Sequence, residues 1–117
     1  MKYMLLVYLA EDAMTETERA HCYVESVQLT QDLNAKGQYL AASPLHSVDT
    51  ATSVRVRDGQ RAVTDGPFAE TREHLGGYYV IEAKDLDEAI SIAERVPPVK
   101  YGTVEIRPVM EIEGLPS

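Results

Sequence analysis

The stretch KYMLLVYL, Lys2–Leu9, is apolar on both of its alternating faces. In an extended strand, one side carries the side chains of Tyr3, Leu5 and Val7, and the other side carries those of Met4, Leu6 and Tyr8. A strand of this kind is normally covered on both sides. It is far shorter than the about 20 apolar residues that a membrane-spanning helix needs. We therefore predict a strand that is covered on both faces rather than a membrane anchor.

A long helix is predicted after this strand, over Thr15–Lys36. Thr15 and Glu18 have the spacing of a capping box, and Gly37 follows where a left-handed residue ends many helices. The helix carries two apolar stripes on nearly opposite sides: Ala20, Tyr23, Val24 and Val27 on one, and Cys22, Leu29 and Leu33 on the other. The pattern leaves open which stripe meets the sheet.

The remaining segments complete two βαβ halves. Asp58-Gly59, between alternating Val and Arg residues, is typical of a two-residue hairpin turn. The other predicted elements are strands at Gln38–Ala42, Tyr78–Ala83 and Thr103–Val109, a hairpin at Ser53–Thr64, and a helix that begins after Asp85 and ends before Pro97. This order predicts an α+β fold, a ferredoxin-like split βαβ sheet with an inserted β-hairpin and both helices on one face.

Helices on one face leave the other face of the sheet without a cover from its own chain. Because Lys2–Leu9 is apolar on that side too, we expect a homodimer in which two sheets pack face to face, a dimeric α+β barrel-like assembly.

Composition limits the classes of function. With 117 residues, 44% apolar and 26% charged, the chain is expected to form a single domain, residues 1–117. Its 19 acidic residues against 11 Lys and Arg give a net charge of −8, which disfavours direct binding to nucleic acid or to an anionic membrane. Cys22 is the single cysteine, and the chain begins without a secretory signal, so we expect a cytoplasmic protein.

Asp65–Tyr79 reads DGPFAETREHLGGYY and resembles the signature of the DGPF branch of the YciI-like (YCII-related) proteins. The resemblance extends to KYMLLVY, to ATSVRVRDG before the motif, to LGGYYVIEA after it and to YGTVEIRPV near the end. It implies a ferredoxin-like fold, usually dimeric through its sheets, in a family whose members often lack an assigned reaction.

Asp65 is the first candidate for acid–base chemistry. Because Pro67 has no N–H, the Asp65 carboxylate cannot close the usual turn onto that residue. His46 and His74 each offer an imidazole that would form a proton-transfer pair with this carboxylate. In a short helical turn after Pro67, Glu70 and His74 would also lie on one face.

A structural interpretation of the same motif stays open. Asp65 would then cap a turn, Phe68 would anchor the core, and Gly76-Gly77 would form a bulge. The spacing of the three histidines does not match a zinc motif, and the chain has no phosphate-binding loop or dinucleotide fingerprint. We therefore expect no metal and no cofactor. Cys22 is interpreted as a packing residue.

The resemblance also implies a pair that this chain lacks. Other members of the family are thought to use a histidine and an aspartate in and after the first helix, and the matching positions fall near Ser26 and Ala35. His21 lies about 140° away from Ser26 around a helix and is a poor substitute.

Candidates for ligand binding are Arg55, Arg107, Glu70 and Tyr78. Arg55 on the hairpin and Arg107 on the last strand would hold a small anionic molecule through charge-assisted hydrogen bonds. The ordinary alternative is that these arginines are solvated or pair with the many carboxylates of the chain.

Two functions from different classes follow. The first is a cofactor-free acid–base enzyme of the lyase or isomerase type, acting on a small polar or anionic substrate. The second is a non-catalytic ligand- or protein-binding module, which the family resemblance links to sigma-factor regulation. A pocket that brings Asp65, a histidine and Arg107 together would favour the enzyme, whereas a filled core around Asp65 would favour the module.

Overall fold

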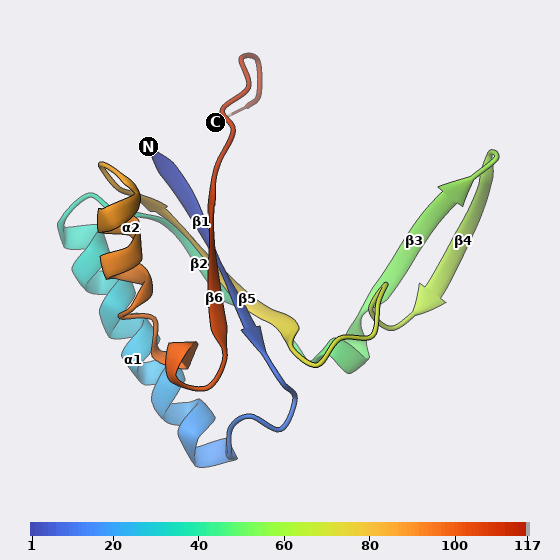
Figure 1. Ribbon diagram of the computed structural model, residues 1–117, viewed down its shortest axis with the longest axis horizontal. Helices are drawn as coiled ribbons and strands as arrows, with labels where there is room; N and C mark the ends of the chain where they lie inside the picture. Colours follow the sequence, from blue (N-terminus) through green and yellow to red (C-terminus); the bar gives the residue numbers. More distant parts are fainter. Residues whose placement is uncertain (117) are drawn as a thin grey trace.

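One four-stranded antiparallel sheet carries both helices on one face, and a separate two-stranded hairpin projects from it (Figure 1). The computed structural model describes residues 1–116. In chain order the elements are β1 (Lys2–Leu9), α1 (Glu16–Ala35), β2 (Tyr39–Pro44), η1 (Val48–Thr50), β3 (Thr52–Arg57), β4 (Gln60–Asp65), β5 (His74–Glu82), α2 (Leu86–Ala93), η2 (Pro97–Lys100) and β6 (Thr103–Pro108). The sheet order β2-β5-β1-β6 is that of the ferredoxin-like fold, so the predicted α+β architecture with its inserted hairpin is confirmed.

Helix α1 begins and ends at the residues that the sequence predicts. Thr15 Oγ1 accepts a hydrogen bond from Glu18 N at 3.1 Å, and the Glu18 carboxylate accepts one from Thr15 N at 2.9 Å, which closes the capping box. Gly37 follows the last turn with φ of 71°, a left-handed conformation that favours glycine. Local chemistry therefore determines both ends of this helix.

The core lies between the two helices and one face of the sheet. Leu5 of β1, Ile81 of β5 and Leu33 of α1 are fully enclosed there. Cys22, Leu29 and Leu33 form the stripe of α1 that packs inward. The opposite stripe, called here the exposed α1 stripe, consists of Ala20, Tyr23, Val24 and Val27.

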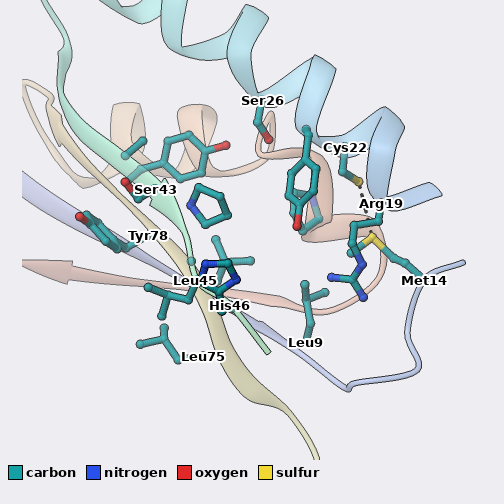
Figure 2. Close-up of a pocket in the computed structure, with 18 of the residues that line it drawn as sticks. Leu9, Met14, Arg19, Cys22, Ser26, Ser43, Leu45, His46, Leu75 and Tyr78 are labelled. Carbon is teal, nitrogen blue, oxygen red and sulfur yellow. Dashed lines mark hydrogen bonds between the residues drawn. The ribbon is translucent and has the colours of Figure 1, made fainter. Parts of the chain in front are cut away.

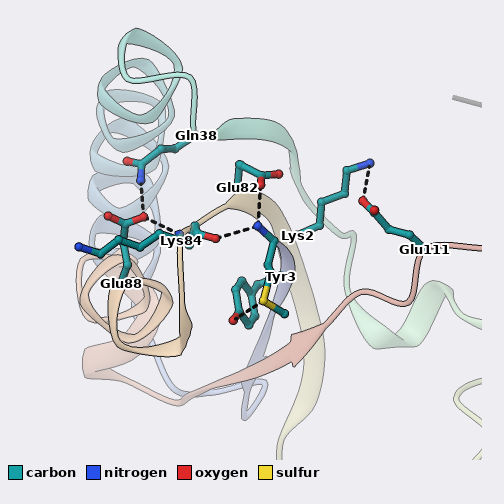
Figure 3. A network of polar contacts seen from close by, with 9 residues as sticks. Lys2, Tyr3, Gln38, Glu82, Lys84, Glu88 and Glu111 are labelled. Carbon is teal, nitrogen blue, oxygen red and sulfur yellow. Dashed lines mark hydrogen bonds and ion pairs between the residues drawn. The ribbon is translucent and has the colours of Figure 1, made fainter.

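Polar contacts close the end of the sheet at which β1 begins (Figure 3). The N-terminal ammonium of Met1 donates to Glu82 Oε1 at 2.7 Å and to the Ala83 carbonyl at 3.0 Å. Glu88 of α2 accepts from Lys84 N at 2.9 Å and from Gln38 Nε2 at 3.2 Å. These contacts tie β1, β5 and α2 together at this end, away from the end where β1 leads into α1.

The segment that leads into β5 differs from the prediction. β5 begins at His74 rather than Tyr78, because His74 pairs with Leu9 and extends the ladder with β1. Residues 67–73 contain no helical turn, so the expectation that Glu70 and His74 share a helical face is wrong. Glu70 and His74 have the spacing of one helical turn, but His74 pairs with Leu9 in the sheet instead.

The glycine pair in β5 has the bulge role of the structural interpretation. The register of β1 and β5 shifts between Val7 and Tyr8, which face Gly77 and Leu75 and leave Gly76 as the extra residue. A Cβ on Gly77 would lie 3.1 Å from the Ser43 carbonyl oxygen, so β2 and β5 approach closely there. The expectation that Phe68 anchors the core is wrong, because this side chain is 78% exposed.

The β3–β4 hairpin, called here the arm, stands away from the rest of the chain (Figure 1). Asp58 and Gly59 have φ of 53° and 74°, as a two-residue turn of this type requires. The ladder places Val54, Val56, Arg61 and Val63 on one face, and Arg55 and Arg57 on the other. The radius of gyration of 16.0 Å exceeds the about 13 Å expected of a compact chain of this length because the arm stands off.

The side of the sheet opposite the helices, called here the open face, is largely apolar at its centre. It carries Met4, Leu6 and Tyr8 of β1 and Tyr78 and Val80 of β5, all half-buried. Arg107 and Glu105 of β6 flank this centre. The expectation that a second subunit packs here stays a prediction.

Leu6→Lys is expected to weaken self-association at least about tenfold, because it would bury an unpaired ammonium between two sheets. Sedimentation velocity at micromolar concentrations measures the change. Leu86→Lys is the matched control, since Leu86 is 52% exposed on α2, away from the open face. A wild-type chain that stays monomeric at these concentrations, or equal behaviour of the two variants, would contradict the prediction.

Candidate functional site

A cavity of about 670 Å³ lies between the N-terminal half of α1 and the end of the sheet where β2 finishes and β5 starts (Figure 2). Arg19, Cys22 and Ser26 line it from α1, and His46 lines it from the loop after β2. Most of the other lining side chains are apolar or aromatic. A concave, mostly apolar site of this size with a few polar groups is the usual form of a small-molecule site.

A carboxylate clamp holds the loop that carries His46. Glu11 Oε1 accepts hydrogen bonds from Ser47 Oγ at 3.2 Å and from Val48 N at 3.1 Å. Glu11 lies just after β1, so the clamp joins the loop after β1 to the loop after β2, and both loops line the cavity. Ser47, which follows His46 in the chain, is thereby held in place, while the exposed His46 imidazole stays accessible.

Arg19 supplies a positive charge to the wall opposite His46 (Figure 2). Within residues 1–116, no carboxylate lies within ion-pairing distance of its guanidinium. A guanidinium with free donors beside apolar surface is suited to a carboxylate, phenolate or similar anion. The cavity therefore combines an imidazole, a cation and an apolar lining.

Two protonated groups form the inner part of the lining. Burial raises the pKa of the Tyr79 phenol, although a hydrogen bond with Ser26 acts in the opposite direction. Burial, and after it the negative charge of Glu25, raises the pKa of the Cys22 thiol. Cys22 Sγ also lies 3.6 Å from Met14 Sδ. A thiol of raised pKa is a poor nucleophile at neutral pH, which agrees with the packing role expected of Cys22.

A family model described as the YCII-related domain matches residues 1–113. The chain belongs to the YCII-related domain family. Among curated proteins, it is 32% identical over 118 residues to "Uncharacterized protein R00369" of Rhizobium meliloti (strain 1021), a match that covers 93% of this chain and 92% of that protein.

A solved structure similar to this YCII-related chain is 5-chloro-2-hydroxyhydroquinone dehydrochlorinase (TftG) from Burkholderia phenoliruptrix AC1100, in complex with 2,5-dihydroxybenzoquinone. The two structures agree with a TM-score of 0.61 and 14% identity over 97% of each chain. At this level of identity the likeness shows a shared fold.

Three of the residues predicted for the site of this YCII-related chain line the cavity: His46, His74 and Tyr78. His74 Nδ1 lies 3.4 Å from Thr71 Oγ1. Tyr78 pairs with Ser43 of the edge strand β2 and belongs to the open face as well. The cavity lining therefore reaches the edge of the open face.

The other predicted residues lie elsewhere. Asp65 is exposed at the base of the arm, Glu70 is exposed in the following loop, and Arg55 lies on the arm. Arg107 lies on the open face, where its guanidinium is 3.8 Å from the Glu105 carboxylate. Within one chain, Asp65 and Arg107 therefore do not share a cavity with a histidine. The roles predicted for Asp65, Glu70, Arg55 and Arg107 stay predictions.

Sequence reasoning missed Arg19 and Glu11, and a signal for Arg19 was present. Arg19 and Ser26 lie on the same side of α1 as Cys22, where the stripe that packs inward is otherwise apolar. Polar residues within such a stripe indicate a helix end that lines a cavity rather than a core. Ser26 is also the position near which the family resemblance places a histidine, and here His46 enters from the opposite wall.

Among residues 1–116, no three His, Cys, Asp or Glu side chains are grouped as a metal site would require. Over the same residues, no helix is both long and apolar enough to cross a bilayer.

Tyr79→Phe is expected to flatten the loss of stability at alkaline pH. Because the folded state raises the pKa of Tyr79, this phenol stabilises the fold fully below its ordinary pKa of about 10, and the contribution is lost as the pH rises through the folded value. Urea unfolding between about pH 8 and about pH 11 measures this. Tyr23→Phe, at a 47% exposed tyrosine, is the control, and equal slopes for both variants would contradict the prediction.

Proposed function

We propose that the cavity is the active site of a cofactor-free enzyme of the lyase or isomerase type, which moves a proton on a small anionic substrate with an apolar body. The observation that carries this proposal is the placement of His46 opposite Arg19 across a mostly apolar cavity. Tyr23 and Tyr39 add aromatic surface to the same lining. Apolar and aromatic surface would bind the body of the substrate, and Arg19 would bind its negative charge.

His46 would exchange the proton in this reaction. Imidazole both accepts and donates a proton near neutral pH, and a positioned acid–base group contributes about 10²–10⁴-fold to rate. His46 removes a proton from a C–H or O–H group of the substrate, and the released electron pair forms a new double bond. Expulsion of a leaving group then gives an elimination, whereas return of the proton at another atom gives an isomerisation. His74, in the same lining, is the second proton carrier.

The named activity of the structural neighbour is of the same chemical type. A dehydrochlorinase removes hydrogen chloride from its substrate, which requires a base for the proton and stabilisation of negative charge. We extend to this chain only that class of chemistry. The compound in the neighbour's structure, 2,5-dihydroxybenzoquinone, is a small oxygen-rich ring and so a suitable probe for a cavity that offers a cation and aromatic surface.

The non-catalytic module remains the second candidate. The open, mostly apolar cavity would also suit a ligand that is bound without reaction. A binding module and an enzyme differ in one respect here, since only the enzyme needs His46 for a proton transfer.

His46→Gln is expected to slow catalysed exchange of the ring protons of 2,5-dihydroxybenzoquinone by at least about 100-fold, because glutamine cannot act as a base. Proton NMR in D₂O follows the exchange. His21→Gln, at an exposed histidine of α1 outside the cavity lining, is expected to behave as wild type.

Binding of the same probe separates recognition from chemistry. Arg19→Gln is expected to weaken binding about tenfold or more, whereas His46→Gln changes it only a few-fold. Exchange at equal rates in His46→Gln and His21→Gln would contradict the enzyme. Binding that depends on Arg19, without any catalysed exchange by wild type, would favour the binding module.

A further inference from the structure

The arm presents an apolar face that no other part of residues 1–116 covers. Val54, Val56 and Val63 share this face and are 62%, 59% and 54% exposed. A two-stranded hairpin without a packing partner is marginally stable in water. The arm therefore needs a cover for its valine face in order to persist as a regular hairpin.

The arm cannot obtain this cover from its own helices. It projects on the side of the sheet opposite α1 and α2, which is the side of the open face (Figure 1). A second chain packed against the open face would consequently lie beside the arm. A six-residue strand spans about 20 Å, whereas stacked sheets lie about 10 Å apart, so the arm is long enough to pass a second sheet and reach the helices behind it.

Charge favours a second copy of this chain as the partner. On the valine face of the arm, Arg61 lies near the tip and Asp65 lies at the base, so the outer part of this face is positive although the chain as a whole carries a net charge of −8. Helix α1 is acidic: its charged residues within Glu16–Ala35 are Glu16, Glu18, Glu25 and Asp32 against Arg19. An arm from one copy is thus complementary in charge to α1 of another.

The exposed α1 stripe is the matching apolar surface. Tyr23, Val24 and Val27 are 47%, 61% and 56% exposed, similar to the valines of the arm. An isologous dimer uses the same pair of surfaces twice, so one chain must carry both members of the pair. This chain carries both, on opposite sides of its sheet, where they cannot meet within one copy (Figure 1).

We propose that the arm is exchanged between two copies, with its valine face packed on the exposed α1 stripe of the second copy. Tyr23 and Val27 also line the cavity, so the exchanged arm borders the cavity mouth of the other subunit. Arg61 lies on the valine face and adds a second positive charge near that mouth. This arrangement is independent of whether the cavity is catalytic.

Cysteine cross-linking between differently tagged chains tests the exchange. A chain with Val54→Cys is mixed with a chain with Val24→Cys, and covalent heterodimers are measured by mass after mild oxidation. The control mixture replaces Val54→Cys with Ala62→Cys, which lies on the other face of the arm. Native Cys22 is buried and common to both mixtures.

Cross-linking through Val54→Cys is expected to be at least tenfold faster than through Ala62→Cys. Equal rates, or no heterodimer from either mixture, would overturn the proposal.

A pair of charge reversals tests the same contact without cysteine. Arg61→Glu and Arg55→Glu change the charge equally but lie on opposite faces of the arm. Under the proposal, Arg61→Glu raises the dimer dissociation constant at least fivefold more than Arg55→Glu does, as measured by sedimentation. Circular dichroism checks that both variants fold alike. Equal dimer dissociation constants for the two variants would overturn the contact. This is also the result expected if the arm binds a different protein instead of a second copy.

Discussion

The two apolar faces of β1 determine how the whole sheet has to be covered. One face is covered by α1 and α2, and Leu5 is fully enclosed on that side. The other face carries Met4, Leu6 and Tyr8 at the centre of the sheet, and no second layer covers this face within the described residues 1–116. Residues 1–116 contain no further helix that covers this face, so the open face and the arm beside it present apolar surface to any second copy.

The position of the cavity follows from how the two ends of the sheet differ. Contacts of Met1 and Glu88 tie the elements together at one end. At the other end, the bulge at Gly76 changes the register of β5, and α1 places Arg19 and Ser26 where its inner stripe would otherwise be apolar. The helix and the sheet therefore enclose space there instead of a core, and the Glu11 clamp holds the loop of His46 against that space.

Much of the fold was predictable because it depends on local chemistry. The capping box at Thr15 and the turn at Asp58-Gly59 are determined by residues close in sequence, and both were predicted correctly. The start of β5 at His74 was not, because it depends on pairing with Leu9, a contact distant in sequence. Which of the two apolar stripes of α1 packs inward likewise depends on contacts with the sheet, which are distant in sequence.

The candidate site was predicted less well for the same reason. His46 follows the end of β2, His74 begins β5 and Tyr78 lies within β5, and all three line the cavity. Residue type singles out Arg55 and Arg107 for anion binding, but the arm and β6 place them on different surfaces. Which arginine lines a cavity depends on the direction of each element, and this follows from packing rather than from residue type.

We infer that one chain is half of the functional unit. Hydrogen–deuterium exchange of the arm, residues 52–65, at a series of protein concentrations tests it most directly. We expect the amides of β3 and β4 to be protected when the chain is dimeric and to exchange quickly on dilution, since an undocked hairpin is marginally stable. Exchange in the arm that is independent of protein concentration across the range from monomer to dimer would contradict an arm docked on a second copy.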